Sequence, residues 1–107
     1  MKRGLVVMAA VILTARLGVI EYQGHRETFY NKSMRRIVSR ANEFYGIEGI
    51  YAEREDGVKT YNGLVICACD WDLHPYGSFV DTSRGMGVVL DTGTFTDRST
   101  VDIAVTW

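Results

Sequence analysis

The stretch Leu64-Val65-Ile66-Cys67-Ala68-Cys69 is apolar at every position. A run of this length without alternating polar residues is typical of a strand that is buried on both faces of a sheet. Cys67 and Cys69 point to the same face of such a strand, where two neighbours form a strained disulfide at best. We therefore interpret both cysteines as small core residues. A lone Cys-x-Cys without further cysteines is also a weak zinc signal.

Turn signals divide the chain around this run into short segments. Asp56-Gly57 and Asn62-Gly63 are dipeptides that favour tight hairpin turns. Short strands are expected at residues 50–53, 58–61, 64–69, 78–81, 87–90 and 101–105. Six short strands with one helix predict a mainly β fold, and closure into a small barrel would leave no sheet edge exposed. We expect a single six-stranded barrel domain over residues 16–107.

One helix is expected over about residues 31–45. Apolar residues recur there at helical spacing, at Met34, Ile37, Val38, Ala41 and Phe44. Asn31 is suited to the N-cap, and Gly46 to the residue that ends the helix. The other face of this helix carries four basic residues, namely Lys32, Arg35, Arg36 and Arg40. We interpret this basic face as solvated, with contact to an anionic wall polymer as the alternative.

Length, composition and charge limit the possible functions. A chain of 107 residues with 47% hydrophobic and 23% charged residues is a folded protein with room for one domain. Its net charge of -1 argues against a general nucleic-acid binder, which would need many cations to neutralise phosphates. From Asp70 to Trp107 the chain has six aspartates against Arg84 and Arg98. Short acidic side chains suit turns, and they also suit a site that holds carboxylates close to the backbone.

The N-terminal segment has the pattern of an export signal. Met1-Lys2-Arg3 precedes an apolar run that ends at Ala15. A basic start followed by a run of this length fits a secretory signal peptide, and the run is too short to cross a bilayer. We expect residues 1–15 to be a signal or a short anchor, and the protein to be secreted or held in the cell envelope. The alternative is that these residues form a buried strand of the domain.

The segment that ends in Asp91-Thr92-Gly93 has two interpretations. Apolar residues followed by Asp-Thr-Gly resemble the active-site loop of aspartic proteases, in which two such loops share one proton. That loop stands early in those proteases, whereas only 14 residues follow Gly93 here. Position therefore argues against a protease.

The second interpretation uses the whole C-terminal half. The segment Asp70-Trp71-Asp72-Leu73-His74-Pro75-Tyr76-Gly77-Ser78 resembles the Asp-x-x-x-x-Pro-x-Gly-[ST] segment of the 3D domain, a family named for three aspartates. Gly87-Val88-Val89-Leu90-Asp91-Thr92-Gly93 resembles its second segment, and Val101-Asp102-Ile103-Ala104 its third. Asp91 and Asp102 are 11 residues apart, as the family pattern requires. The resemblance covers residues 27–107 and is strongest from Asp70 onward.

The resemblance implies a fold, a substrate and three roles. The fold is a double-psi β-barrel related to the catalytic barrel of membrane-bound lytic transglycosylase A, and the substrate is peptidoglycan. Asp102 matches the aspartate that acts as acid/base in the transglycosylases, Asp91 its neighbour in the groove, and Asp70 the first aspartate of the set. Residues 17–22 are the candidate for the first barrel strand.

These residue types suit cleavage of the MurNAc–GlcNAc bond. The leaving oxygen needs a proton, and burial together with the nearby Asp91 would raise the pKa of Asp102 and keep it protonated. We expect Trp71 and Tyr76 to stack on sugar rings, and Thr92 and Gly93 to contact substrate beside Asp91. A non-catalytic module that binds peptidoglycan is the alternative.

The remaining expectations concern partners and cofactors. Peptidoglycan glycan strands are the expected partner, and the protein is expected to act as a monomer without nucleic acid. Asp70, Asp72 and His74 alternate like metal ligands on a strand, but Pro75 interrupts that strand at once. We therefore expect no metal and no cofactor, and contact with a membrane only through residues 1–15.

Overall fold

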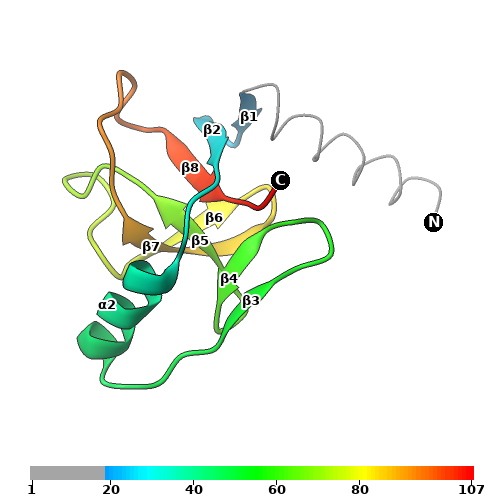
Figure 1. Ribbon diagram of the computed structural model, residues 1–107. Coiled ribbons are helices and arrows are strands. Elements are labelled where there is room, and N and C mark those ends of the chain that lie inside the picture. The colour runs from blue at the N-terminus through cyan, green and yellow to red at the C-terminus, as the bar shows by residue number, and fades with distance from the viewer. Residues whose placement is uncertain (1–18) are drawn as a thin grey trace.

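Residues 19–107 are described by the computed structural model, and they form eight strands and one helix (Figure 1). The strands are β1 (Ile20–Tyr22), β2 (His25–Tyr30), β3 (Tyr51–Glu53), β4 (Lys59–Tyr61), β5 (Leu64–Ala68), β6 (Phe79–Thr82), β7 (Gly85–Asp91) and β8 (Val101–Ala104), and the helix is α2 (Arg35–Tyr45). The expected mainly β fold is confirmed. The expected signal segment at residues 1–15 lies outside the described residues. Within residues 19–107 no helix is long and apolar enough to cross a membrane.

The six expected strands are all present, shifted by one or two residues at their ends. Two further strands, β1 and β2, form a hairpin whose turn places Gln23 and Gly24 at positive φ. A turn with positive φ at both central residues matches the twist of a hairpin. Sequence reasoning missed this hairpin because its second strand, His25–Tyr30, is mostly polar and lacks the apolar pattern of a buried strand.

Strand β5 is the centre of the sheet. It pairs in parallel with β7 along one edge, and in antiparallel fashion with β4 and then β8 along the other. The sheet continues from β8 to β2 and β1, from β4 to β3, and from β7 to β6. The expectation of a closed six-stranded barrel is therefore wrong: the eight described strands form one open mixed sheet. Strands β1, β3 and β6 are the three edge strands of this branched sheet, and no backbone ladder within residues 19–107 joins β1 to β6.

The side chain of Glu27 connects β2 to the turn between β6 and β7. Glu27 of β2 is fully buried, and its carboxylate accepts hydrogen bonds from the backbone N–H and the hydroxyl of Ser83, in the turn between β6 and β7. The ring of His25 lies 3.0 Å from the same carboxylate. A buried carboxylate needs such partners to offset its loss of hydration. The sheet is thus held in a curled shape without a closed ladder.

Two hydrophobic clusters lie on the two faces of β5. The first contains both cysteines with valines of β5, β7 and β8, and the second lies between the sheet and α2. Met34, Ile37 and Ala41 are the residues of the helical segment that are buried in the second cluster. The interpretation of Cys67 and Cys69 as core residues is confirmed, because both are fully buried and unpaired.

The helix begins later than expected. Met34 occupies its N-cap and Gly46 its left-handed C-cap, so the predicted end is correct and the predicted start at Asn31 is wrong. The reason is that the Asn31 side chain accepts a hydrogen bond from the buried Lys59, whose ammonium also donates to the Lys32 carbonyl. Residues 31–34 form a connection between β2 and α2 that is neither strand nor helix.

Candidate active site

Asp91 and Asp102 approach each other across the central strand. Asp91 ends β7 and Asp102 lies in β8, and both are in register with Ala68 of β5. Strands in a sheet are about 4.8 Å apart, so the two Cα atoms are separated by roughly 10 Å. A register shift between Cys67 and Ala68 places Asp91, rather than Leu90, opposite Ala68. Both aspartates therefore project to the face on which Ala68 lies.

Asp91 is surrounded by donors. Its Oδ2 atom lies 2.7 Å from the Lys32 ammonium and accepts a hydrogen bond of 3.0 Å from the Tyr30 hydroxyl. Its Oδ1 atom accepts a bond of 2.9 Å from the backbone N–H of Thr92. Three donors, one of them cationic, stabilise the negative charge of this carboxylate.

Asp102 has a different environment. It is partly buried, and the one side chain in residues 19–107 that donates to it is Thr28, at 2.8 Å from Oδ1. Burial raises the pKa of Asp102, and the charge of Asp91 raises it further, against a lowering by the Thr28 hydrogen bond. This is the environment that favours a protonated carboxyl, as a general acid requires.

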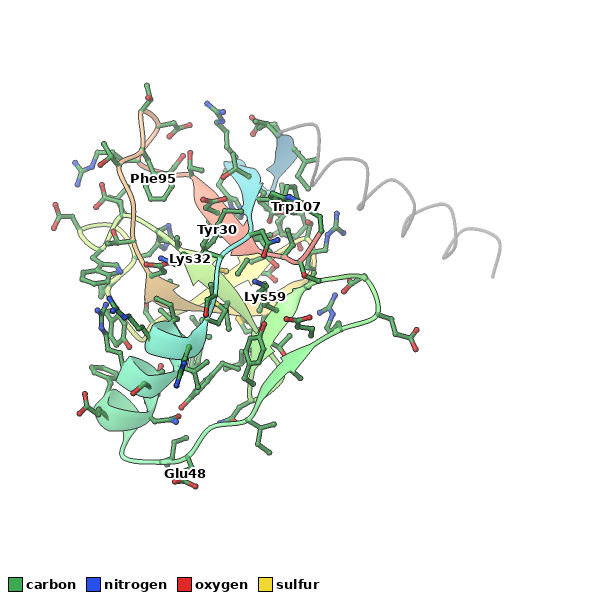
Figure 2. The ribbon with its side chains drawn as sticks, in the orientation of Figure 1. Tyr30, Lys32, Glu48, Lys59, Phe95 and Trp107 are labelled. Atoms are coloured by element: carbon green, nitrogen blue, oxygen red, sulfur yellow. The ribbon has the colours of Figure 1, made fainter. Side chains whose placement is uncertain are left out.

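Tyr30 remains a proton donor to Asp91. Burial and the adjacent Asp91 charge raise the pKa of its phenol far above the ordinary value. Figure 2 shows Tyr30 and Lys32 side by side on the segment that leads from β2 to α2. Neither residue was predicted for the site, and nor was Thr28. The signal that could have found Thr28 and Tyr30 is the stretch from Glu27 to Asn31, with which the expected resemblance begins; Lys32 follows this stretch directly.

The four residues expected to bind sugar lie in different surroundings. Trp71 and Tyr76 lie together, with ring centroids 5.4 Å apart, and with Phe44 they line a hollow of about 550 Å³. The Trp71 indole also donates to the Asp91 carbonyl at 3.0 Å. Thr92 instead donates its hydroxyl to the Cys69 carbonyl. Gly93 is exposed and lies against the ring of Phe95.

Asp70 has the contacts of a loop anchor. It forms an ion pair with Arg98, which also contacts Asp72 at 3.1 Å. Its Oδ1 atom accepts the backbone N–H of Asp72, and the hydrogen bond from Arg98 is the main cause of its lowered pKa. Arg98 thereby joins the loop after β7 to the loop after β5, and both loops extend to the same side of the molecule (Figure 1). The structure thus places Asp91 and Asp102 on either side of β5, whereas Asp70 forms an ion pair with Arg98.

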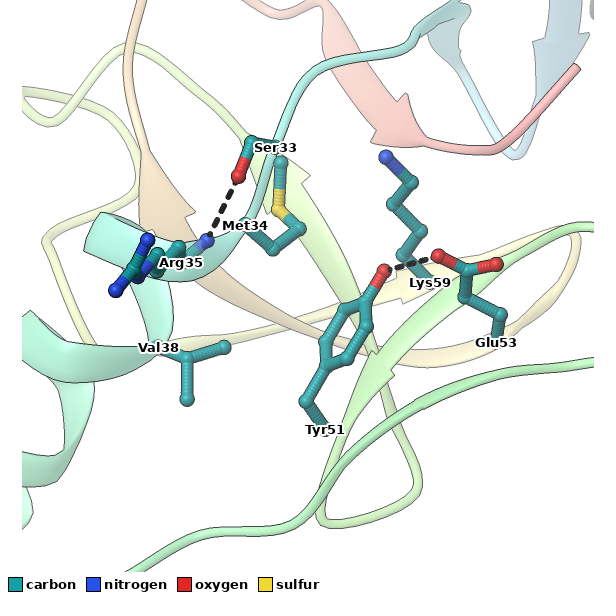
Figure 3. A pocket seen from close by; sticks show the side chains of 7 residues that line it. All are labelled: Ser33, Met34, Arg35, Val38, Tyr51, Glu53 and Lys59. Atoms are coloured by element: carbon teal, nitrogen blue, oxygen red, sulfur yellow. Dashed lines mark hydrogen bonds between the residues drawn. The ribbon is translucent and has the colours of Figure 1, made fainter.

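Three hollows follow one another along α2. The middle one, of about 530 Å³, is lined by Asp91, Ile37 and a set of polar and basic residues, Lys32, Ser33, Arg35, Arg36 and Arg40. It shares Arg40 with the aromatic hollow at Trp71. It shares Ser33 and Arg35 with a third hollow of about 410 Å³, where Tyr51 donates to Glu53 beside Lys59 (Figure 3).

No cluster of three or more His, Cys, Asp or Glu side chains in residues 19–107 is arranged to hold a metal ion. Comparisons with protein families, with curated proteins and with solved structures found no match. The functional conclusion therefore depends on the geometry of Asp91 and Asp102 and on the hollows along α2, one of which Asp91 lines.

Proposed function

We propose that the protein cleaves the MurNAc–GlcNAc β-1,4 bond of peptidoglycan in the manner of a lytic transglycosylase, with Asp102 as acid/base. The observation that carries the proposal is the contrast between two neighbouring carboxyls. Asp91 is held by Lys32 and Tyr30, whereas Asp102 is partly buried with a raised pKa. A carboxyl with a raised pKa beside a second carboxyl that is already held by donors suits a reaction with one acid/base.

The reaction needs one proton to move twice. Asp102 donates its proton to the glycosidic oxygen, and the bond from that oxygen to the MurNAc anomeric carbon breaks. The resulting Asp102 carboxylate then takes the proton of the MurNAc C6 hydroxyl, whose oxygen bonds to the same anomeric carbon. The product is a 1,6-anhydro sugar, no water is consumed, and Asp102 regains its proton. The negative charge of Asp91 stabilises the positive charge that develops on the sugar ring.

Hydrolysis fits this site less well. A glycoside hydrolase uses a second carboxylate as nucleophile or as base for a water molecule. Asp91 is the neighbouring carboxylate, and its oxygens already accept bonds from Lys32, Tyr30 and the Thr92 backbone. Its role is therefore electrostatic.

We also propose that the curled sheet belongs to the double-psi barrel class of the 3D family. The arrangement of the three aspartate segments supports this kinship. The first segment connects β5 to β6, and the second and third run through β7 and β8, which flank β5 on opposite edges. Action on the cell wall requires export, so we propose that residues 1–15 are an export signal.

A wall-binding module without catalysis is the second candidate. The aromatic hollow at Trp71, Tyr76 and Phe44 favours it, because such rings bind sugars whether or not a bond is cleaved. Incubation of the protein with purified peptidoglycan, followed by mass spectrometry of the soluble products, separates the two. Anhydro-muropeptides support the transglycosylase, and retention on the wall without soluble products supports the binder. Reducing-end muropeptides without the anhydro form would refute the assignment of a single acid/base.

A further inference from the structure

The middle hollow along α2 carries unbalanced positive charge. Lys32 is paired with Asp91, but Arg35, Arg36 and Arg40 form no ion pair with any carboxylate in residues 19–107. All three arginines are exposed and line the same hollow as Asp91. A concave surface with several unpaired guanidinium groups attracts anions and holds carboxylates in a bidentate geometry.

The charge is placed beside Asp91, the neighbour of the proposed acid/base. Arg36 and Arg40 are four residues apart, so they lie one above the other on the same side of α2. Arg40 also lines the aromatic hollow with Trp71 and Tyr76, whose one carboxylate is Glu43. A ligand that reaches from the Trp71 ring toward Asp91 therefore passes Arg40 and Arg36 in turn.

We propose that this basic hollow binds the carboxylates of the peptide stems on peptidoglycan, and so directs the protein to stem-bearing strands. The inference rests on the proposed function, since it assigns the part of the same substrate that lies next to the glycan. The muramic acid ring carries its peptide on a lactyl group beside the bond to be cleaved. A sugar on the aromatic hollow thus brings stem carboxylates to the arginines. Phosphate polymers of the wall would provide phosphates rather than carboxylates that are held beside a muramic acid ring.

The test compares two soluble substrates that differ in the stem carboxylates. One is uncrosslinked peptidoglycan strands, and the other is the same strands after an amidase has removed the peptides, which leaves one lactyl carboxylate on each muramic acid and none of the stem carboxylates. The ratio of cleavage rates on the two substrates is measured for the native chain, for Arg36→Gln/Arg40→Gln, for Arg36→Lys/Arg40→Lys and for Arg54→Gln. Arg54 is a control cation that is paired with Asp56 in the turn between β3 and β4.

We expect the native chain to prefer stem-bearing strands, and the glutamine variant to lose roughly five- to tenfold of that preference. The lysine variant keeps the charge and should keep most of the preference, and Arg54→Gln should leave the ratio unchanged. Equal cleavage of both substrates by the native chain would overturn the inference while the proposed function stands. So would a ratio that the glutamine variant leaves intact.

A binding arm distinguishes the remaining outcomes. If neither substrate is cleaved, the proposed enzymatic function fails. Isothermal titration of the protein with each soluble substrate then measures the same preference as a ratio of affinities. A native preference for stems that the glutamine variant loses then still supports the inference, and its absence overturns it. Binding to purified wall teichoic acid that is stronger than binding to stem-bearing strands, and equally sensitive to the glutamine variant, would assign the hollow to phosphates and overturn it.

Discussion

The ammonium of Lys32 lies 2.7 Å from the carboxylate of Asp91, and this pair joins the connection between β2 and α2 to the end of β7. The Asp91 side chain is 9% exposed and that of Lys32 48%, so the pair lies at the rim of the site rather than in the core. Its consequence falls on a third residue. The negative charge of Asp91 raises the pKa of Asp102. We expect the Lys32 ammonium to offset part of that charge, because it is paired with Asp91.

Lys32→Met should therefore shift the pH dependence of activity. Without the cation the field at Asp102 becomes more negative, so the pKa of Asp102 should rise further. A general acid works while it is protonated, so the alkaline limb of the activity profile should move to higher pH. Initial rates on peptidoglycan across the pH range measure the shift.

Asp91→Asn is the matched variant with the opposite sign. It removes the negative charge and should lower the pKa of Asp102, so the alkaline limb moves to lower pH. Shifts of the two variants in the same direction would contradict electrostatic coupling between Asp91 and Asp102. At high salt both shifts should become smaller.

Asp102→Asn should separate catalysis from stability. The amide keeps its size and still accepts the Thr28 hydrogen bond, but it has no proton to donate. Activity should fall by about 10²–10⁴-fold. An Asp with a raised folded-state pKa contributes stability below its unfolded pKa and loses it as pH rises through the folded value. At neutral pH the variant should therefore be at least as stable as the native chain.

Thermal unfolding at pH 4 and pH 7 measures the second part of this prediction. As the pH rises from 4 to 7, the free energy of unfolding should fall more for the native chain than for Asp102→Asn. A folded variant that retains most of its muralytic activity would exclude Asp102 as the acid, and the search would move to Asp70 and Asp72.

The elements that were predictable from sequence are those whose pattern is local. The run from Leu64 to Cys69 had to be buried on both faces, and Gly46 had to end the helix, because each follows from the residues themselves. Asp91 directly follows the expected strand 87–90, and Asp102 lies near the start of the expected strand 101–105. Their alignment on Ala68 depends on strand pairing, which periodicity does not reveal.

The elements that were missed depend on partners distant in sequence. Strand β2 has polar residues at His25, Arg26, Glu27 and Thr28, and its burial follows from hydrogen bonds to residues more than fifty positions away. The expected closure of the barrel failed for a related reason. The number of strands does not determine whether the first and the last pair with each other, and here side chains of Glu27 and Ser83 make the connection.

Gly77→Ala should disturb the aromatic hollow. Gly77 has φ +80° in the turn from Pro75 to Ser78, and an added Cβ would lie 2.5 Å from a ring carbon of Phe44. The left-handed conformation alone costs an L-residue about 1–2 kcal/mol. Gly63→Ala is a close control, because Gly63 has φ +79° and no heavy atom within 4 Å of its added Cβ.

Urea unfolding of the two glycine variants isolates the contact with Phe44. Both should lower the free energy of unfolding, and Gly77→Ala should also weaken binding to peptidoglycan, since Phe44 must move out of the hollow that it lines with Trp71 and Tyr76. Unchanged binding by a folded Gly77→Ala chain would show that this hollow does not contact the wall.

Glu27→Gln tests the connection between β2 and the turn that joins β6 to β7. The buried carboxylate accepts bonds from the Ser83 N–H, the Ser83 hydroxyl and the His25 ring, whereas an amide accepts at one oxygen and presents an N–H₂ group to the remaining donors. A buried donor without a partner costs about 1–3 kcal/mol, so the free energy of unfolding should fall by that amount. Glu48→Gln, at an exposed position distant from the site, should change it by less than about 0.5 kcal/mol (Figure 2).

Because Thr28 follows Glu27 directly and donates to Asp102, the rate of glycan cleavage should fall with stability in Glu27→Gln. If both stay at native values in urea titration and in the activity assay, the curl of the sheet must be held by its core alone.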